Sequence, residues 1–351
     1  MRENGQEREN DERWMAAALG EARKGIGLTS PNPPVGAVVV RGGEVVGKGF
    51  HAKAGEAHAE VAALADVQAR GNVPAGATLY LTLEPCSTHG RTPPCCDSSL
   101  AAGLGRVVYA VADPNPAHAG RADAVLSEAG IAVESGIGAD AARVILRPFA
   151  RRVTTGLPWV IAKAGMSLDG KIARPRGETQ WLTGEAARAD AHRLRSTVDA
   201  IVVGAGTVRA DDPALTVRGP AFRIEKEQPW RVVLTRSGEL PANARVLTDE
   251  HKARTRVYSG EALETILRDL VALGCNAVLV EGGGEVLGEF FAAGLVDEVV
   301  CYVAPLWCGA GDGTVPVGGA VELGASVELD GLGATVMGDG SLRVQGLVVR
   351  P

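Results

Sequence analysis

Histidine and cysteine side chains stand in three short motifs whose residue types suit a metal ion. His58 opens the stretch His-Ala-Glu, Cys86 follows Pro85, and Cys95 follows two prolines. Imidazole nitrogens and thiolates are ligands that zinc prefers, and a catalytic zinc keeps three protein ligands and a fourth position for water. Bound zinc lowers the pKa of that water and supplies hydroxide at neutral pH. The three motifs therefore indicate a catalytic zinc centre.

A carboxylate accompanies this centre. Glu60 lies two residues after His58, at the expected start of a helix. Hydroxide attack on an amino-bearing ring carbon needs a group that moves protons from water to the ring nitrogen and the leaving amine. A histidine ligand followed by a glutamate that is not a ligand is typical of zinc-dependent nucleobase deaminases. Eight residues separate Cys86 from Cys95, in place of the short Pro-Cys-x-x-Cys form, so a different substrate is expected.

Two other interpretations of these residues stay open. The first is a buried histidine with two unrelated cysteines, which the full set with Glu60 disfavours. The second is a structural zinc with Cys96 as its fourth ligand, although adjacent residues such as Cys95 and Cys96 rarely point the same way. Three of the six cysteines cluster here, and in a cytosolic chain such a cluster indicates metal binding or catalysis sooner than disulfides.

A glycine-rich turn is the clearest feature of the second half. Residues 278–288 read as a strand, the turn Glu281-Gly-Gly-Gly284 and a helix. Backbone amides at such a helix start bind phosphate, but the same pattern also occurs as plain packing. The turn is not a Gly-x-Gly-x-x-Gly fingerprint in a first βαβ unit, so a Rossmann fold is not predicted.

Hydrophobic periodicity predicts alternating helices and strands in both halves. In the first half we expect helices at 11–24, 58–70, 95–102 and 123–129, and strands at 35–40, 44–50, 78–83, 106–111 and 131–134. In the second half we expect helices at 185–195, 262–273 and 285–293, and strands at 159–163, 200–203, 231–234, 277–280 and 298–303. Both halves are therefore predicted to be α/β.

The 351 residues fit two domains, and the stretch 148–158 breaks the pattern between them. We expect a first domain at 14–150 and a second at 157–351. Residues 1–13 carry many charges of both signs and no apolar core, so they are predicted to be a disordered tail and not a secretory signal. No run of about 18 apolar residues is present to span a bilayer, and we expect a cytoplasmic protein.

The net charge of the chain limits the classes of binding partner that we expect. The net charge is −6 and no basic stripe is visible, which disfavours a nucleic acid. A small phosphate needs only a few local donors. We therefore expect small-molecule partners, no nucleic acid, no membrane, and a homo-oligomer whose size the sequence leaves open.

An ordered series of motifs resembles a known family over nearly the whole chain. The motifs are Pro31-Asn-Pro33, Val35-Gly-Ala37, His58-Ala-Glu60, the stretch 84–96, Asp113-Pro-Asn-Pro116, Lys163-Ala-Gly-Met-Ser-Leu-Asp-Gly170, the stretch 177–183, His192-Arg-Leu-Arg195, the stretch 204–218 and Glu281-Gly-Gly-Gly284. They are similar to the bifunctional deaminase–reductase of riboflavin biosynthesis, the RibD type. The resemblance implies a cytidine-deaminase-like three-layer αβα domain and a C-terminal dihydrofolate-reductase-like α/β domain. It also implies zinc-dependent deamination of 2,5-diamino-6-ribosylamino-pyrimidinone 5'-phosphate, then NADPH-dependent reduction of the ribosyl to a ribityl chain.

For the deaminase, the resemblance implies that His58, Cys86 and Cys95 hold one zinc and that Glu60 shuttles protons. Further residues implied to bind substrate are Asn32 and His51 at the pyrimidine or its sugar, and Arg91, Asp113 and Asn115 at the ribose phosphate. Asp-Pro and Asn-Pro also form turns, so Asp113 and Asn115 can be read as a turn alone, and Arg91 as a solvated loop charge.

For the reductase, the resemblance implies an NADPH site at Gly165, Trp181, Thr207, Asp211 and Gly283, and substrate contacts from Lys163, Thr179, Arg195, Leu215, Arg218 and Glu281. Arg195 and Arg218 suit a phosphate because a guanidinium pairs two oxygens at once. Thr179 stands where others have serine, and Thr235 where many members carry Asp; Arg236 follows and could pair with the extra ribose phosphate of the cofactor. Lys163 and Glu281 are both candidates to assist proton movement. Trp181 can equally be a core residue.

Three rival functions remain. One is a single-activity pyrimidine deaminase with a non-catalytic reductase-like half. The intact reductase motifs disfavour it. A second is a nucleic-acid deaminase, disfavoured by the acidic charge and the long Cys86–Cys95 loop. The third is a non-enzymatic zinc protein, which has no need of Glu60.

Overall fold

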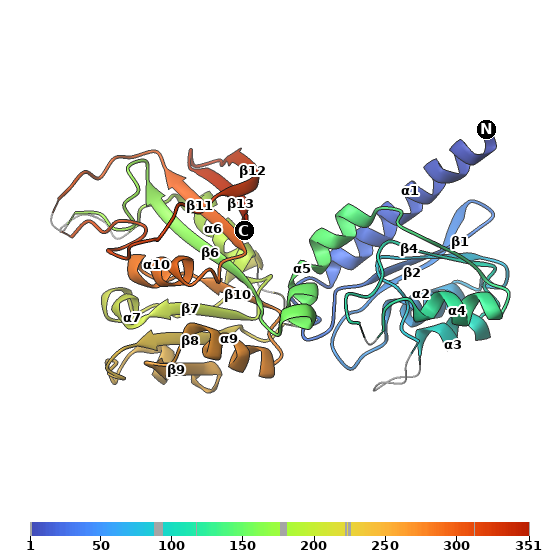
Figure 1. The fold of residues 1–351 in the computed structure, drawn as a ribbon, viewed down its shortest axis with the longest axis horizontal. Helices are drawn as coiled ribbons and strands as arrows, with labels where there is room; N and C mark the ends of the chain where they lie inside the picture. Colours follow the sequence, from blue (N-terminus) through green and yellow to red (C-terminus); the bar gives the residue numbers. More distant parts are fainter. Residues whose placement is uncertain are drawn as a thin grey trace. The chain divides into compact units, whose positions relative to one another are not determined.

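The fold is described from a computed structural model for residues 2–87, 94–116, 118–175, 181–221, 223, 226–311 and 313–350. The chain divides into two compact units, residues 1–155 and 156–351, each with its own sheet (Figure 1). The division expected from sequence ended the first domain at 150 and began the second at 157.

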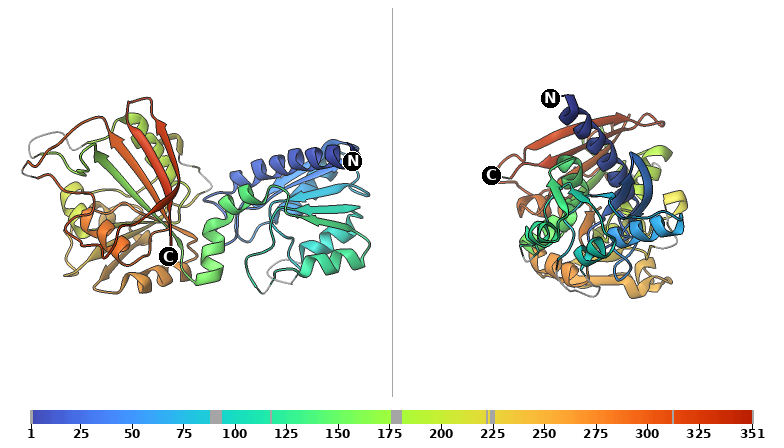
Figure 2. Two further views of the ribbon diagram at one scale, coloured as in Figure 1. Left: turned by 45° about the horizontal axis from the view of Figure 1, so that its top comes forward. Right: turned by 90° about the vertical axis from the view of Figure 1, so that its right-hand side faces the viewer.

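The first unit is a five-stranded sheet between two layers of helices. Its elements are α1 (Arg2–Lys24), β1 (Gly36–Arg41), β2 (Glu44–Phe50), α2 (Ala59–Ala69), β3 (Thr78–Leu81), α3 (Cys95–Ala101), β4 (Arg106–Tyr109), α4 (Arg121–Glu128), β5 (Ala132–Ser135) and α5 (Ala139–Thr155). The strand order is β2-β1-β3-β4-β5, with β3, β4 and β5 parallel. Helices α1 and α5 pack together on one face, and α2, α3 and α4 cover the other (Figure 2).

Two glycines allow the close approach of helices to opposite faces of this sheet. A Cβ at Gly36 would lie 2.1 Å from the Ala18 carbonyl oxygen of α1. A Cβ at Gly49, which pairs with Ala37 and so points to the other face, would lie 2.5 Å from the Ala63 nitrogen of α2. The αβα layering and the element order expected from sequence are confirmed up to β5.

The expected disordered tail at residues 1–13 is wrong, because α1 begins at Arg2. The cause lies far along the chain. Asp11 is 2% exposed, and its carboxylate accepts hydrogen bonds from the Tyr80 hydroxyl (2.5 Å) and from both terminal nitrogens of Arg106 (2.8 and 2.7 Å). A buried carboxylate is stable when it is paired in this way, and it fixes the middle part of α1 around Asp11 to the sheet.

The stretch 148–158 is also more regular than expected. Pro148 lies inside α5, which continues to Thr155. A proline in a helix removes one backbone hydrogen bond, and burial of an amphipathic face offsets that loss. That face of α5 buries Ala142, Ile145 and Leu146.

The second unit is an eight-stranded sheet of order β12-β13-β11-β6-β10-β7-β8-β9. Its elements are β6 (Trp159–Ser167), α6 (Glu185–Arg195), β7 (Ala200–Gly204), α7 (Ala205–Asp211), η1 (Gly219–Ala221), β8 (Trp230–Thr235), α8 (Arg245–Thr248), η2 (Lys252–Arg254), β9 (Thr255–Ser259), α9 (Leu263–Ala272), β10 (Ala277–Val280), α10 (Gly284–Ala292), β11 (Glu298–Ala304), β12 (Leu329–Val336) and β13 (Leu342–Val348). The strands from β11 to β9 in this order are parallel, and β12 and β13 are antiparallel.

Helices cover both faces of the parallel strands, so the strands are buried on both sides. One core packs α9 and α10 against the sheet, and the other packs α6, α7 and α8. The elements α7, α8, β9, β12 and β13 were not predicted. In the part of the chain that the structure describes, no helix combines the length and apolar character needed to cross a membrane.

Candidate functional site

The predicted zinc ligands meet at one point in the first unit. The ligand atoms of His58, Cys86 and Cys95 all lie within 4.8 Å of one another. His58 Nδ1 is 3.1 Å from the Cys95 sulfur and 3.8 Å from the Cys86 sulfur. His58 immediately precedes α2, Cys86 follows β3, and Cys95 is the first residue of α3. One imidazole and two sulfurs converging in this way fit a three-ligand catalytic zinc site.

The electrostatics of the sulfurs favour a metal. A hydrogen bond from the Cys95 thiol, opposed by burial and reinforced by His58, lowers the pKa of Cys86 to about 4. The same shared hydrogen bond, with burial, raises the pKa of Cys95. The lowered pKa favours the thiolate form of Cys86, which is the form that ligates metals. Cys96 is fully buried with its sulfur 3.9 Å from the Pro85 carbonyl oxygen, and it is not a member of the ligand cluster in the described chain.

Glu60 lies beside the ligands in the first turn of α2. Its side chain is 4% exposed and lines the same cavity as His58 and Cys86. Burial raises the pKa of Glu60 above its ordinary value, while His58 acts in the opposite direction. A carboxyl group whose pKa moves toward neutrality is suited to taking up and returning a proton.

A cavity of about 290 Å³ opens onto these residues and contains the sequence-predicted Asn32, His51, Asp113 and Asn115. The Ala57 carbonyl accepts a hydrogen bond from His51 Nδ1 at 3.0 Å, so Nδ1 carries the proton of the neutral ring. His51 Nε2 therefore accepts a hydrogen bond from the Asn32 side-chain amide at 3.0 Å. Burial lowers the pKa of His51 and keeps its ring neutral. The Asn32 amide is thus oriented by a histidine of fixed tautomer.

Asp113 and Asn115 form a turn and also line the cavity, so the turn is confirmed and their binding of substrate stays a prediction. The Asp113 carboxylate accepts from the Asn115 amide at 2.8 Å. Behind the turn, the buried carboxylate of Glu84 accepts from the backbone amides of Asp113 (3.0 Å), Gly120 (3.0 Å) and Ala122 (3.2 Å). Glu84 therefore fixes the loop that carries Asp113. Arg91 lies outside the described residues.

Sequence reasoning missed several residues of this cavity, among them Glu84, His118, Phe149 and Arg152. Glu84 stands next to Pro85 in the cysteine motif, which was a usable signal. Phe149 and Arg152 belong to α5, in a stretch interpreted as a linker, so their helical spacing was not considered.

The second unit has a cleft of about 1340 Å³ at the carboxyl ends of its parallel strands. Parallel α/β sheets commonly bind ligands at this edge. The cleft brings together the predicted residues Lys163, Gly165, Trp181, Arg195, Thr207, Asp211, Leu215, Arg218, Arg236, Glu281 and Gly283. Thr179 lies outside the described residues. Trp181 is 61% exposed and stacks with Arg188 at 5.3 Å, so it is not a core residue.

A buried ion pair forms one wall of this cleft. Arg195 donates to both carboxylate oxygens of Glu281, at 2.6 and 2.8 Å, and Lys163 lies 3.6 Å from the same group. Burial would raise the pKa of Glu281, but the charges of Arg195 and Lys163 outweigh it and lower the pKa to about 2. Glu281 is therefore ionised, and much of the Arg195 fork is already engaged with it.

The loop after α7 is held in an unusual conformation at the cleft. Asp212 and Leu215 are non-glycine residues with positive φ, 38° and 50°. Such strain persists where the surroundings hold it, and it concentrates at ligand sites. The Asp212 carboxylate accepts from the Arg245 backbone amide at 2.7 Å.

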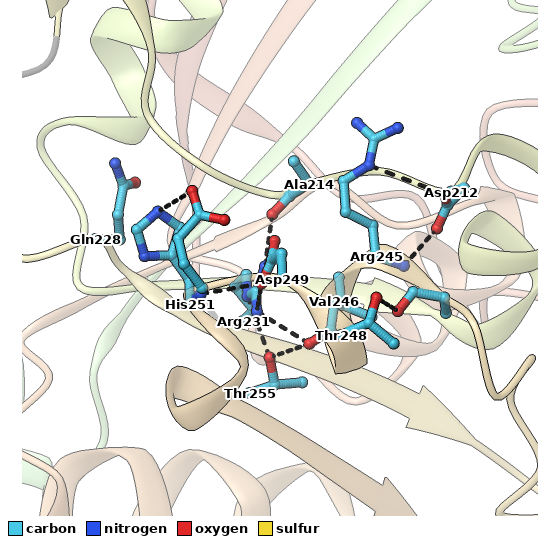
Figure 3. A network of polar contacts seen from close by, with 12 residues as sticks. Asp212, Ala214, Gln228, Arg231, Arg245, Val246, Thr248, Asp249, His251 and Thr255 are labelled. Atoms are coloured by element: carbon cyan, nitrogen blue, oxygen red, sulfur yellow. Dashed lines mark hydrogen bonds and ion pairs between the residues drawn. The ribbon is translucent and has the colours of Figure 1, made fainter.

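Arg231 supports the same loop from beneath (Figure 3). It is fully buried on β8, forms a bidentate pair with Asp249 at 2.7 and 2.8 Å, and donates to the Ala214 carbonyl at 3.1 Å. The carbonyl next to Leu215 is thus fixed by a guanidinium whose own charge is neutralised.

In the glycine turn, two of the three glycines serve packing, while phosphate binding at the turn stays a prediction. A Cβ at Gly282 would lie 2.6 Å from Val286, and one at Gly284 would lie 2.5 Å from the Pro316 carbonyl, so these two positions serve packing. A Cβ at Gly283, the residue before α10, would have the Thr207 hydroxyl as its nearest neighbour, at 3.6 Å. Gly283 and Thr207 both line the cleft. Arg236 is 79% exposed at its side chain and pairs with Glu289 at 2.9 Å.

These two units define a zinc-dependent base deaminase joined to an α/β reductase. The comparisons agree: residues 8–111 match the family "Cytidine and deoxycytidylate deaminase zinc-binding region", and residues 158–341 match "RibD C-terminal domain". The riboflavin biosynthesis protein RibD of Escherichia coli K12 is 42% identical over 86% of this chain and 89% of its own length. The RibD of Bacillus amyloliquefaciens is also 42% identical, over 85% of each chain.

Solved structures agree over nearly the full length of this chain. Acinetobacter baumannii RibD is 35% identical with a TM-score of 0.85, over 98% of this chain and 100% of that one. A Thermotoga maritima diaminohydroxyphosphoribosylaminopyrimidine deaminase/5-amino-6-(5-phosphoribosylamino)uracil reductase is 33% identical with a TM-score of 0.86 over the same shares. The chain belongs to the RibD family. It is a bifunctional deaminase and reductase of riboflavin biosynthesis that uses zinc and NADPH, which confirms the predicted fold, activities and cofactors.

Proposed function

We propose that His58, Cys86 and Cys95 hold the zinc ion and that Glu60 moves the protons of the deamination. The observation that carries this is the convergence of three ligand atoms within 4.8 Å beside a buried carboxyl in one cavity. When bound, zinc supplies a water activated for attack at neutral pH. As the hydroxide adds to the ring carbon, Glu60 carries one proton of that water to the ring nitrogen. It then carries the remaining hydroxyl proton to the amine, so the C–N bond breaks, ammonia departs and the ring carbonyl forms. Asn32, oriented by neutral His51, holds the pyrimidine or its sugar, and the turn of Asp113 and Asn115 holds the ribose phosphate together with Arg91.

For the reductase, we propose that NADPH lies along Gly165, Trp181, Thr207, Asp211 and Gly283, with Arg236 at its extra phosphate. Arg236 would then exchange Glu289 for the cofactor. We assign the substrate to Lys163, Thr179, Arg195, Leu215, Arg218 and Glu281. NADPH supplies hydride to the anomeric carbon of the opened ribose. The nitrogen bonded to that carbon must gain one proton as the C=N bond is reduced. Since Glu281 is ionised, we assign this proton to Lys163, which Glu281 holds in place.

Removing zinc tests the deaminase half. Exposure to a strong zinc chelator is expected to abolish ammonia release from the diaminopyrimidinone ribose phosphate and to leave NADPH oxidation with the deaminated substrate unchanged, since the two sites lie in separate units. Metal content, ammonia and NADPH absorbance are measured on the same sample, and added Zn²⁺ should restore ammonia release. The ligand assignment would be overturned if protein prepared with ample zinc bound none. It would also be overturned if ammonia release continued after the zinc had been removed.

We also propose that the protein is a cytoplasmic homo-oligomer. Free thiols at all six cysteines suit a reducing compartment. The edge strand β12 exposes Leu332 (65%) and Val336 (76%), and apolar side chains on an unpaired edge favour association with another copy. Light scattering is expected to give a multiple of the chain mass, lowered by Val336→Lys. A monomer mass for the unaltered chain would contradict the proposal.

A further inference from the structure

One face of α5 forms part of the wall of the deaminase cavity. Phe149, Arg152 and Val153 follow the i, i+3, i+4 spacing of a single helical face, and all three line the cavity that contains Glu60. We propose that Arg152 binds the phosphate of the deaminase substrate and sets the preference for phosphorylated over unphosphorylated pyrimidines. This inference rests on the proposed deaminase function.

The hydrogen bonding of Arg152 leaves room for an anion. One terminal nitrogen donates to the Pro31 carbonyl at 3.4 Å, which is a long contact. The Nε atom is buried and has no hydrogen-bond partner among the described residues. Within the same set of residues, no carboxylate lies within ion-pair distance of this guanidinium. A half-buried guanidinium without a counter-charge is costly, and an anionic ligand would remove that cost.

Three carboxyl groups of the described residues line the cavity, and none of them is a counter-charge for Arg152: Glu60 lies beside the zinc ligands, and the other two accept backbone amides. Both oxygens of Glu84 accept backbone amides, and Asp113 accepts the amide of Asn115. Arg152 supplies the one guanidinium among the described residues that line the cavity. The phosphate is the one anionic group of the proposed substrate, and a guanidinium can pair two of its oxygens at once.

A purely structural role for Arg152 would be to stabilise the carboxyl end of α5, where it stands in the last turn. The contact that it makes argues against this. Its terminal nitrogen reaches Pro31, next to Asn32 in the cavity, and not a carbonyl of its own helix. The side chain is directed toward the substrate-binding residues.

The test compares two substrates in three variants. Ammonia release is measured with the diaminopyrimidinone ribose phosphate and with its dephosphorylated counterpart, for Arg152→Gln, Arg152→Lys and the matched neighbour Arg151→Gln, which does not line the cavity. We expect Arg152→Gln to raise KM for the phosphorylated substrate about 10–100-fold, the usual effect of losing a hydrogen bond between charged groups. The kcat for the phosphorylated substrate should stay unchanged, and so should the kcat/KM for the dephosphorylated substrate. Arg152→Lys should restore part of the phosphate preference, and Arg151→Gln should keep all of it.

Inorganic phosphate provides a second readout. It should inhibit the unaltered enzyme competitively and inhibit Arg152→Gln at least about tenfold more weakly. Equal losses on both substrates, or an unchanged KM for the phosphorylated one, would overturn the inference while leaving the deaminase intact. Ammonia release from neither substrate by the unaltered, zinc-loaded protein would refute the proposed function itself, and the inference with it.

Discussion

Replacing Glu60 by Gln is expected to slow ammonia release by about 10²–10⁴-fold while the zinc content remains one per chain. Gln has nearly the same shape, but it cannot take a proton from water or return one to the leaving amine. Zinc should stay because Glu60 is not a member of the ligand cluster. Ammonia assays and metal analysis on the same protein check both parts.

Two controls make the Glu60 result specific. Glu56→Gln changes an exposed carboxylate four residues earlier that does not line the cavity, and it should leave the rate unchanged. NADPH oxidation with the deaminated substrate should be equal in all three proteins. If zinc were lost together with activity, Glu60 would be a structural support of the metal site and its proposed role would be wrong.

The second large effect is expected at the ion pair of the reductase cleft. Arg195→Met would leave the Glu281 carboxylate buried with Lys163 alone, 3.6 Å away. Breaking a buried pair on one side typically costs about 3–5 kcal/mol of unfolding free energy. Because Arg195 and Glu281 both line the cleft and are proposed to contact the substrate, we expect NADPH oxidation to fall at least about 100-fold, consistent with losing charge-assisted hydrogen bonds at a reacting centre.

The pH dependence of stability provides an independent measurement. The pKa of Glu281 in the folded protein is about 2, below its ordinary value of 4.5. The pair therefore stabilises the fold above pH 4.5, and this contribution is lost as the pH falls from 4.5 toward 2. In Arg195→Met the loss over that range should be much smaller. Urea unfolding between these pH values tests this.

Arg193→Met is the matched control for the ion pair. Arg193 is on the same helix, its side chain is 74% exposed, and its ion pair with Asp190 is long at 3.8 Å. Exposed pairs of this kind contribute little, so stability and reductase activity should be close to those of the unaltered chain. An Arg195→Met protein with the same acid profile as the unaltered chain would contradict the role given to the pair.

The chemistry of the zinc site was predictable because it depends on residue type and short spacing. His58 and Glu60 are neighbours at one helix start, and the cysteines follow a strand and open a helix. The buried strands were predictable because their apolar runs are continuous. Strand β12 was not, since most of its residues are exposed and it is held by pairing with β13.

The parts that sequence reasoning missed depend on distant partners. Asp11 is 69 residues from Tyr80 and 95 residues from Arg106 in the sequence, and no local sequence pattern predicts their contact. Arg231 lies in an apolar strand as a fully buried cation, which is stable because it donates to Asp249 and to two backbone carbonyls. Arg152 required knowing that α5 continues through Pro148.

The buried Asp11 carboxylate has a practical bearing on how this protein is produced. The charged composition of the first residues could suggest a shortened chain that begins at Trp14. In that chain the Tyr80 hydroxyl would lose its hydrogen-bond acceptor. Arg106 would keep Glu134 as its remaining described partner. The central strand of the deaminase sheet, β3, and its neighbour β4 carry those side chains. Trimming for crystallisation or fusion to another protein should therefore leave the segment around Asp11 in place.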